Sequence, residues 1–107
     1  MDDIAGYSVV HHFTPGCYTK EMKISAGMAV GQHKHEYDHI SHLAKGTALV
    51  IKDGAATRYH APAFLNIEKG INHQINAETD VIWFCIHATN ETDVDLVDDS
   101  VIQKRGK

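Results

Sequence analysis

The chain has 107 residues, which fits one domain and is far below the roughly 250 residues of a TIM barrel. Fourteen acidic against ten basic side chains give a net charge of −4, which disfavours a nucleic-acid-binding module. No apolar run approaches the ~20 residues of a membrane span, and the start at Met1 lacks the apolar stretch of a secretory signal. Cys17 and Cys85 form no Cys-x-x-Cys pair. We expect a cytoplasmic protein with reduced cysteines and with neither a nucleic-acid nor a membrane partner.

Short segments of strand-like composition follow one another along the chain, separated by glycines and turns. They are Tyr7–Phe13, Tyr18–Ser25, His39–Ala44, Thr47–Lys52, Ala55–His60, Phe64–Ile67 and Asp80–Ala88. An Asp-Gly pair at Asp53 and Gly54, between two of these runs, is a strong β-hairpin signal. Residues Asp93–Ile102 allow either a short C-terminal helix or an edge segment. The pattern predicts one all-β domain over residues 1–107, a sandwich or barrel.

Nine histidines are unusual for this length, and four of them stand at suggestive spacings. His33 and His35 are two residues apart, which on a strand places both imidazoles on one face. His39 follows a tight turn and opens the next strand, and His73 comes much later. Imidazole suits zinc, copper, iron, nickel and, less strongly, manganese. If the strands are neighbours, these side chains can converge on one ion.

The spacing resembles the first motif of the cupin superfamily, which runs Gly, five residues, His-x-His, three or four residues, Glu, six residues, Gly. Here Gly27, His33, His35, His39 and Gly46 stand at those spacings, with a histidine in place of the glutamate.

The second cupin motif matches less closely. It runs Gly, five residues, Pro-x-Gly, two residues, His, three residues, Asn. Gly70 and His73 match it, whereas Pro62 and Glu68 replace the expected glycine and proline, and Asn76 comes one place early. Together the two motifs extend over residues 27–76.

The resemblance implies a small antiparallel β-barrel of jelly-roll type, with a metal ion held by His33, His35, His39 and His73. The chain is similar to four-histidine single-domain cupins, many of which are manganese or iron proteins, and several are assigned as dioxygenases. Manganese and iron are therefore the first expectations, with nickel, copper and zinc as alternatives. Four neutral imidazoles leave the full charge of a divalent ion uncancelled, so the site should favour an anionic ligand.

Strand parity extends the set of interior residues. On the last long strand it leaves two registers open, with either Trp83, Cys85 and His87 or Ile82, Phe84 and Ile86 facing the interior. The resemblance implies an aromatic and a small residue near the metal, which favours Trp83 and Cys85 inward. We expect a substrate pocket lined by Val30, Ser41, Ile75, Trp83, Cys85 and His87. Tyr37 and Asp38, between two ligands, are candidates to orient the histidines. Gly31 should face inward if His33 and His35 do. His42 should point away from the site, and the residues give no assignment for His11, His12 or His60. Arg58, beside Tyr59, could hold a carboxylate at the opening.

Three functions stay open at this point. The first is a metal-dependent dioxygenase-like enzyme acting on a small organic substrate, a diketone, a phenol-like compound or a carboxylate. The second is a metal-dependent isomerase or lyase, in which the metal acts only as a Lewis acid. The third is a non-catalytic cupin that binds a small molecule. The resemblance also implies a homodimer, with the N-terminal strands as candidate contacts because exposed strand edges are usually covered.

Overall fold

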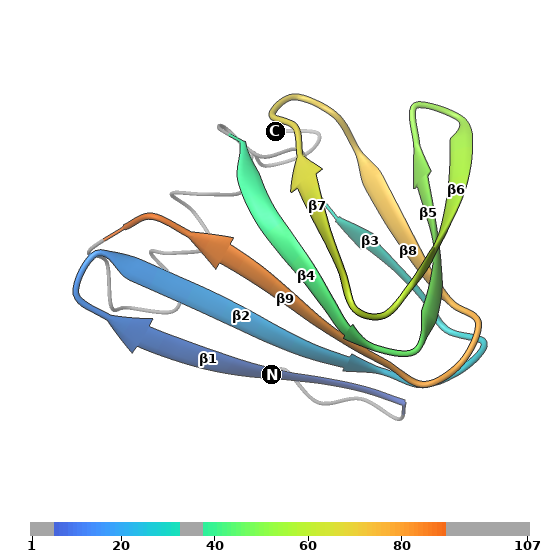
Figure 1. Ribbon diagram of the computed structural model, residues 1–107, viewed down its shortest axis with the longest axis horizontal. Coiled ribbons are helices and arrows are strands. Elements are labelled where there is room, and N and C mark those ends of the chain that lie inside the picture. Colours follow the sequence, from blue (N-terminus) through green and yellow to red (C-terminus); the bar gives the residue numbers. More distant parts are fainter. Residues whose placement is uncertain (1–5, 33–37, 90–107) are drawn as a thin grey trace.

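The computed structural model describes residues 6–32 and 38–89, and these residues form β-strands and no helix (Figure 1). The strands are β1 (Tyr7–Thr14), β2 (Cys17–Ile24), β3 (Ala29–Gln32), β4 (His39–Lys45), β5 (Thr47–Lys52), β6 (Ala55–His60), β7 (Ala63–Ile67), β8 (His73–Ala77) and β9 (Val81–His87). The all-β expectation is therefore confirmed. The residues for which a short C-terminal helix was considered, 93–102, lie outside the described part of the chain.

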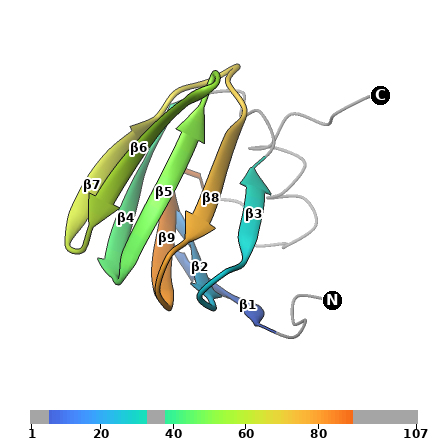
Figure 2. The same ribbon diagram turned by 90° about the vertical axis from the view of Figure 1, so that its right-hand side faces the viewer.

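The strands pair antiparallel in two sheets that face each other (Figures 1 and 2). The five-stranded sheet has the order β1-β2-β9-β4-β7, and the four-stranded sheet has the order β3-β8-β5-β6. Strands β6 and β7 follow each other in the chain but belong to different sheets, and each pairs with one other strand only. The two sheets share no ladder at either edge, and one of these open sides of the barrel lies between the edges of β6 and β7.

The β5–β6 hairpin has the bounds that the sequence predicts, residues 47–52 and 55–60. Asp53 and Gly54 form its two-residue turn with φ of 54° and 80°. Two successive positive φ angles are typical of the type I′ turn, which matches the twist of the flanking strands. The turn places Lys52 directly before it, opposite Ala55 in the register.

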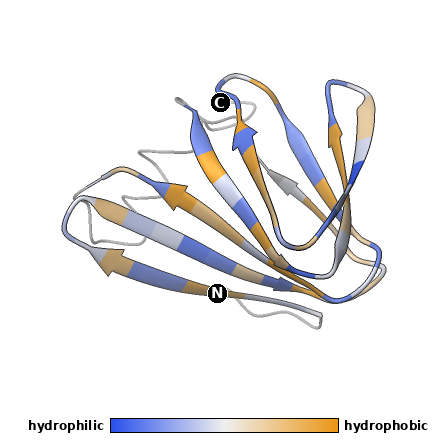
Figure 3. Ribbon diagram, in the orientation of Figure 1, coloured by the Kyte–Doolittle hydropathy of each residue, from blue (hydrophilic) through white to orange (hydrophobic). Residues whose placement is uncertain are grey.

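Strand β9 lies at the centre of the five-stranded sheet, between β2 and β4, and Figure 3 shows hydrophobic colours over most of its length. Its alternate residues Val81, Trp83, Cys85 and His87 are buried. The register that the family resemblance favours, with Trp83 and Cys85 facing the interior, is therefore the one observed. Trp83 has no exposed surface, and truncating a buried tryptophan typically costs about 3–5 kcal/mol.

The two N-terminal strands differ in whether they have an edge that is not paired with another strand. β1 is an edge strand, whereas β2 is paired on both sides, with β1 and β9. Of the two candidates for a dimer contact, β1 alone therefore has a free edge for strand pairing within the described residues. In this part of the chain, no helix has the length and apolar character that crossing a membrane requires.

The turn between β4 and β5 gives a test of local packing. Gly46 has a φ of 91°, and a Cβ atom there would overlap the carbonyl oxygen of Asp80 and approach the Thr79 hydroxyl. Gly46→Ala should lower the free energy of unfolding by about 2 kcal/mol or more, because backbone strain and overlap add. Gly54→Ala is the matched control, since its φ is 80° and nothing lies within 4 Å of the added Cβ.

Urea denaturation of both variants measures the difference. Equal losses for Gly46→Ala and Gly54→Ala would show that the close approach to Asp80 contributes nothing.

Candidate functional site

The inner face of the five-stranded sheet changes from apolar to polar along its strands. Met22 and Leu43 both pair with Trp83, and all three belong to the hydrophobic core. Two residues further along β9, Cys85 pairs with Ser41; two further still, His87 pairs with Tyr18. Polar interior groups thus gather at the end of β9 that is away from the apolar core.

His39 lies at this polar end, as the first residue of β4, and is buried. Its Nε2 atom is 3.4 Å from the Ser41 hydroxyl, which also donates to the Cys85 sulfur at 3.7 Å. The His87 ring lies against it, with centroids 4.3 Å apart. Tyr18 stacks on the other side of His87 at 5.6 Å. These contacts fix the plane of the His39 ring.

His73 reaches the interior from the opposite sheet, as the first residue of β8. It is buried, on the same face of the strand as Ile75 in the core. Within the described residues, neither of its ring nitrogens has a hydrogen-bond partner of good distance and angle. The pKa of His73 is lowered, chiefly by burial; the nearby backbone of Ile71 opposes this shift, and the positive charge of Lys52 adds to it. The ring is therefore held in the neutral form, which is the form that binds metal ions.

Asp38 connects the two segments that carry His39 and His73. Its Oδ1 atom accepts a hydrogen bond of 2.9 Å from the backbone N–H of Lys69, in the connection between β7 and β8. This bond ties the residue next to His39 to the loop that leads to His73. The orienting role expected of Asp38 toward the histidine rings stays a prediction. Tyr37, the other candidate for that role, lies outside the described residues.

His33 and His35 also lie outside the described residues, but the strand before them is informative. Val30 is half-buried, pairs with Ile75 and packs against the core. Gly31 is exposed, so the inference that it faces inward is wrong: β3 alternates in the opposite phase. The interior placement of His33 and His35 stays a prediction.

The described residues fit part of the expected metal site. Among residues 6–32 and 38–89, no three His, Cys, Asp or Glu side chains are close enough to hold a metal ion. The two described members of the expected set, His39 and His73, both lie on inner faces, on opposite sheets. A buried polar group without a partner is costly. A divalent ion is a partner that suits the neutral imidazole of His73.

A pocket of about 320 Å³ lies beside His73. None of the six residues expected to line a substrate pocket borders it: Val30, Ser41, Ile75, Trp83, Cys85 and His87 lie elsewhere in the interior, and their role as pocket residues stays a prediction. The lining residues are Val50, Lys52, Ala55, Thr57, Tyr59, Phe64, Leu65, Asn66, Ile67 and His73.

Sequence reasoning did not single out Lys52, the cation of this pocket. Its signal is its parity with Ala48 and Val50, the buried residues of β5. Arg58, which was considered as a carboxylate-binding residue, instead forms two hydrogen bonds to Glu78, of 2.6 and 2.8 Å. It does not border the pocket.

The histidines without a spacing argument make local contacts. His11 is hydrogen-bonded to the Tyr18 hydroxyl at 2.7 Å, His12 to Glu21 at 2.7 Å, and His60 to the Thr47 hydroxyl at 3.0 Å. His42 is half-buried on the outer face, as expected. It donates to the Ala63 carbonyl at 3.2 Å and stacks on Phe64. These partners give the four rings structural roles on the sheets.

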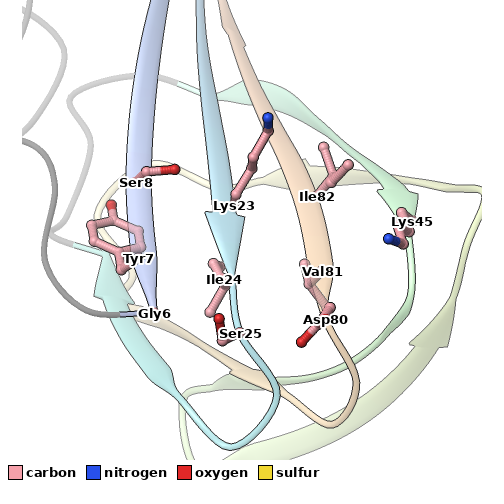
Figure 4. A pocket seen from close by; sticks show the side chains of 10 residues that line it. All are labelled: Gly6, Tyr7, Ser8, Lys23, Ile24, Ser25, Lys45, Asp80, Val81 and Ile82. Carbon is pink, nitrogen blue, oxygen red and sulfur yellow. The ribbon is translucent and has the colours of Figure 1, made fainter.

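A second pocket, of about 480 Å³, lies at the Val81 end of β9, the end opposite to His87 (Figure 4). It is lined by Lys23, Lys45 and Asp80 among others and contains no histidine. Val81 and His87 are six positions apart on β9, which is about 20 Å along the strand.

The chain matches no protein-family model and no curated protein. Solved structures do resemble it. A mutant of salicylate 1,2-dioxygenase from Pseudoaminobacter salicylatoxidans, in complex with gentisate, superposes with a TM-score of 0.78 at 12% identity, covering 99% of this chain and 31% of that one. KdgF from Halomonas sp. superposes with a TM-score of 0.72 at 18% identity, covering 90% of this chain and 88% of that one. This chain has the cupin fold.

The cupin fold agrees with the resemblance in the two histidine motifs. The chain covers about a third of the dioxygenase, 31% of its length, and nearly all of KdgF. At 12% and 18% identity the likeness concerns the fold. In this fold, His39 and His73 lie on different sheets.

The buried state of His73 predicts a pH dependence for the metal-free protein. Its pKa in the folded chain lies below the ordinary value of 6.5. As the pH falls through 6.5, His73 takes up a proton in the unfolded chain but stays neutral in the folded chain, so the free energy of unfolding falls. His73→Phe should reduce this slope. Urea denaturation at several pH values between about 8 and 5 measures it, and equal slopes in the two proteins would contradict the prediction.

Proposed function

We propose that this protein is a metal-binding cupin whose divalent ion is held by His33, His35, His39 and His73. The observation that carries the proposal is His73, a buried neutral imidazole on an inner face with no hydrogen-bond partner among the described residues. The motif spacing supports the other three ligands. Manganese or iron is the favoured ion, and nickel, copper or zinc would also suit imidazoles.

Such an ion would supply a Lewis-acid centre with open positions for a chelating ligand. The protein's own contribution is positioning. The Ser41 hydroxyl and the His87 ring hold the His39 ring, and Asp38 fixes the adjoining loop. The buried setting excludes water and keeps the His73 ring neutral. Since neutral imidazoles cancel none of the ion's charge, an anionic small molecule is the favoured ligand.

We further propose a dioxygenase-like reaction on a small organic substrate. The shared fold with salicylate 1,2-dioxygenase is the reason to name this reaction class first. An isomerase or lyase and a non-catalytic binding protein are the alternatives. A cytoplasmic location and a homodimer through the β1 edge complete the proposal.

Among the described residues that line the pocket, the side chains that could transfer a proton are His73, Tyr59 and Lys52.

Metal content tests the ligand set. His39→Ala and His73→Ala should each lower the affinity for Mn²⁺ or Fe²⁺ at least about tenfold, because each removes one imidazole from the ion. Elemental analysis of protein purified without added metal, followed by titration with each ion, measures this. His42→Gln is the matched control, because His42 lies on the outer face of the same strand. Unchanged metal content in His73→Ala would refute the site.

Dioxygen dependence tests the reaction class. Manganese- or iron-loaded protein should consume dioxygen when a substrate is present and show no turnover without it. An oxygen electrode and product analysis, with gentisate as the first probe, make the measurement. Conversion of a substrate under anaerobic conditions would contradict the proposal in favour of an isomerase or lyase. Ligand binding without turnover in any metal form would favour a binding protein.

A further inference from the structure

The pocket beside His73 occupies the open side of the barrel, between the edges of β6 and β7. Val50 forms part of its wall from the four-stranded sheet, and Leu65 and Ile67 form part of it from β7. Its volume is about 320 Å³, whereas a dry cavity of ~150 Å³ suffices to bind benzene. The pocket is therefore large enough for a one-ring compound with substituents, and it has an apolar wall for the ring.

Lys52 supplies the positive charge of this pocket. It pairs with His73 in the register between β5 and β8, so the two side chains project from neighbouring positions of one sheet. Its ammonium group donates a hydrogen bond of 2.8 Å to a carboxylate oxygen of Glu68. Both side chains are 44% exposed. An ion pair this exposed contributes little to stability, so Lys52 can exchange one carboxylate for another at small cost.

We propose that this pocket binds small organic carboxylates, with Lys52 as the anchoring cation and Glu68 as the internal carboxylate that the ligand displaces. The inference deepens the proposed function, because it assigns a substrate class and a specificity-determining residue to the same site. A carboxylate on Lys52 would have its ring against Leu65 and Ile67 and the rest of the molecule next to His73.

The charges around the pocket favour Lys52 over the other cation nearby. Arg58 is engaged by both carboxylate oxygens of Glu78 and does not line the pocket. The pKa of Lys52 is raised, chiefly by the hydrogen bond and the charge of Glu68, so its ammonium stays charged at neutral pH. Lys52 is thus the charged group positioned to meet an anion beside His73.

The test is a calorimetric titration with benzoate and with benzamide, its neutral analogue, on both the metal-free and the metal-loaded full chain. Wild-type protein should bind benzoate more tightly than benzamide. Lys52→Met should weaken benzoate binding about tenfold or more and abolish the preference, because it removes a charge-assisted hydrogen bond. Lys52→Arg should retain the preference. Lys23→Met, an exposed lysine on β2, is the matched control and should change nothing.

Glu68→Gln tests the displaced carboxylate. It leaves Lys52 without its anionic partner, so benzoate should bind more tightly than to the wild type. Unchanged or weaker binding would overturn the role of Glu68. Absence of benzoate binding, no preference over benzamide, or full affinity in Lys52→Met would overturn the role of Lys52.

The two proposals fail separately in these experiments. Metal content is measured on the same samples, and the metal-free arm tests Lys52 without any ion. A protein that binds no metal yet prefers benzoate through Lys52 refutes the metal site and supports this inference. A protein that binds metal through His73 but binds benzoate and benzamide equally supports the metal site and refutes this inference.

Discussion

The central position of β9 is the constraint on which the remaining structure depends. It pairs with β2 on one side and β4 on the other, and its inward residues run from Val81 through Trp83 to His87. Its first part, with Val81 and Trp83, belongs to the hydrophobic core. Towards its other end, the pairing with β4 brings Cys85 next to Ser41 and His87 next to His39. The register between β9 and β4 thus decides which side chains meet at the candidate metal site. A slip of one residue would turn Trp83 out to solvent and His39 away from His87.

Local signals account for much of the fold. The turn at Asp53 and Gly54 needs positive φ at both positions, which few residues adopt easily, so the sequence is specific there and the hairpin could be predicted to the residue. Period-two alternation leaves two possible interior registers for β9, and the family resemblance is what favours the one with Trp83 and Cys85 inward. Which strands become neighbours could not be predicted from such local signals. The adjacency of β9 and β4 and the separation of β6 from β7 depend on long-range packing, and the pattern of a single sequence does not reveal it.

The site was predictable only in part, for reasons that particular residues illustrate. His39 and His73 follow from motif spacing, and each lies on an inner face. Gly31 shows where extrapolation fails, because alternation read backwards from His33 assumes an uninterrupted strand, and β3 has the opposite phase. Lys52 was missed because a lysine before a turn is usually solvated. Its position becomes informative only once β8 places His73 opposite to it.

The open side of the barrel also has a mechanical consequence. Strands β6 and β7 share no ladder, and the backbone N–H of Ala61, between them, is held by the carbonyl of Gly46 at 2.9 Å. Within the described residues, the corner at Ala61 is therefore fixed through the backbone, whereas β6 and β7 meet through side chains along the rest of their length. Leu65 and Ile67 of β7 and Tyr59 of β6 line the pocket there. Substitutions at these positions can therefore alter the shape of the pocket without removing a hydrogen bond from either sheet.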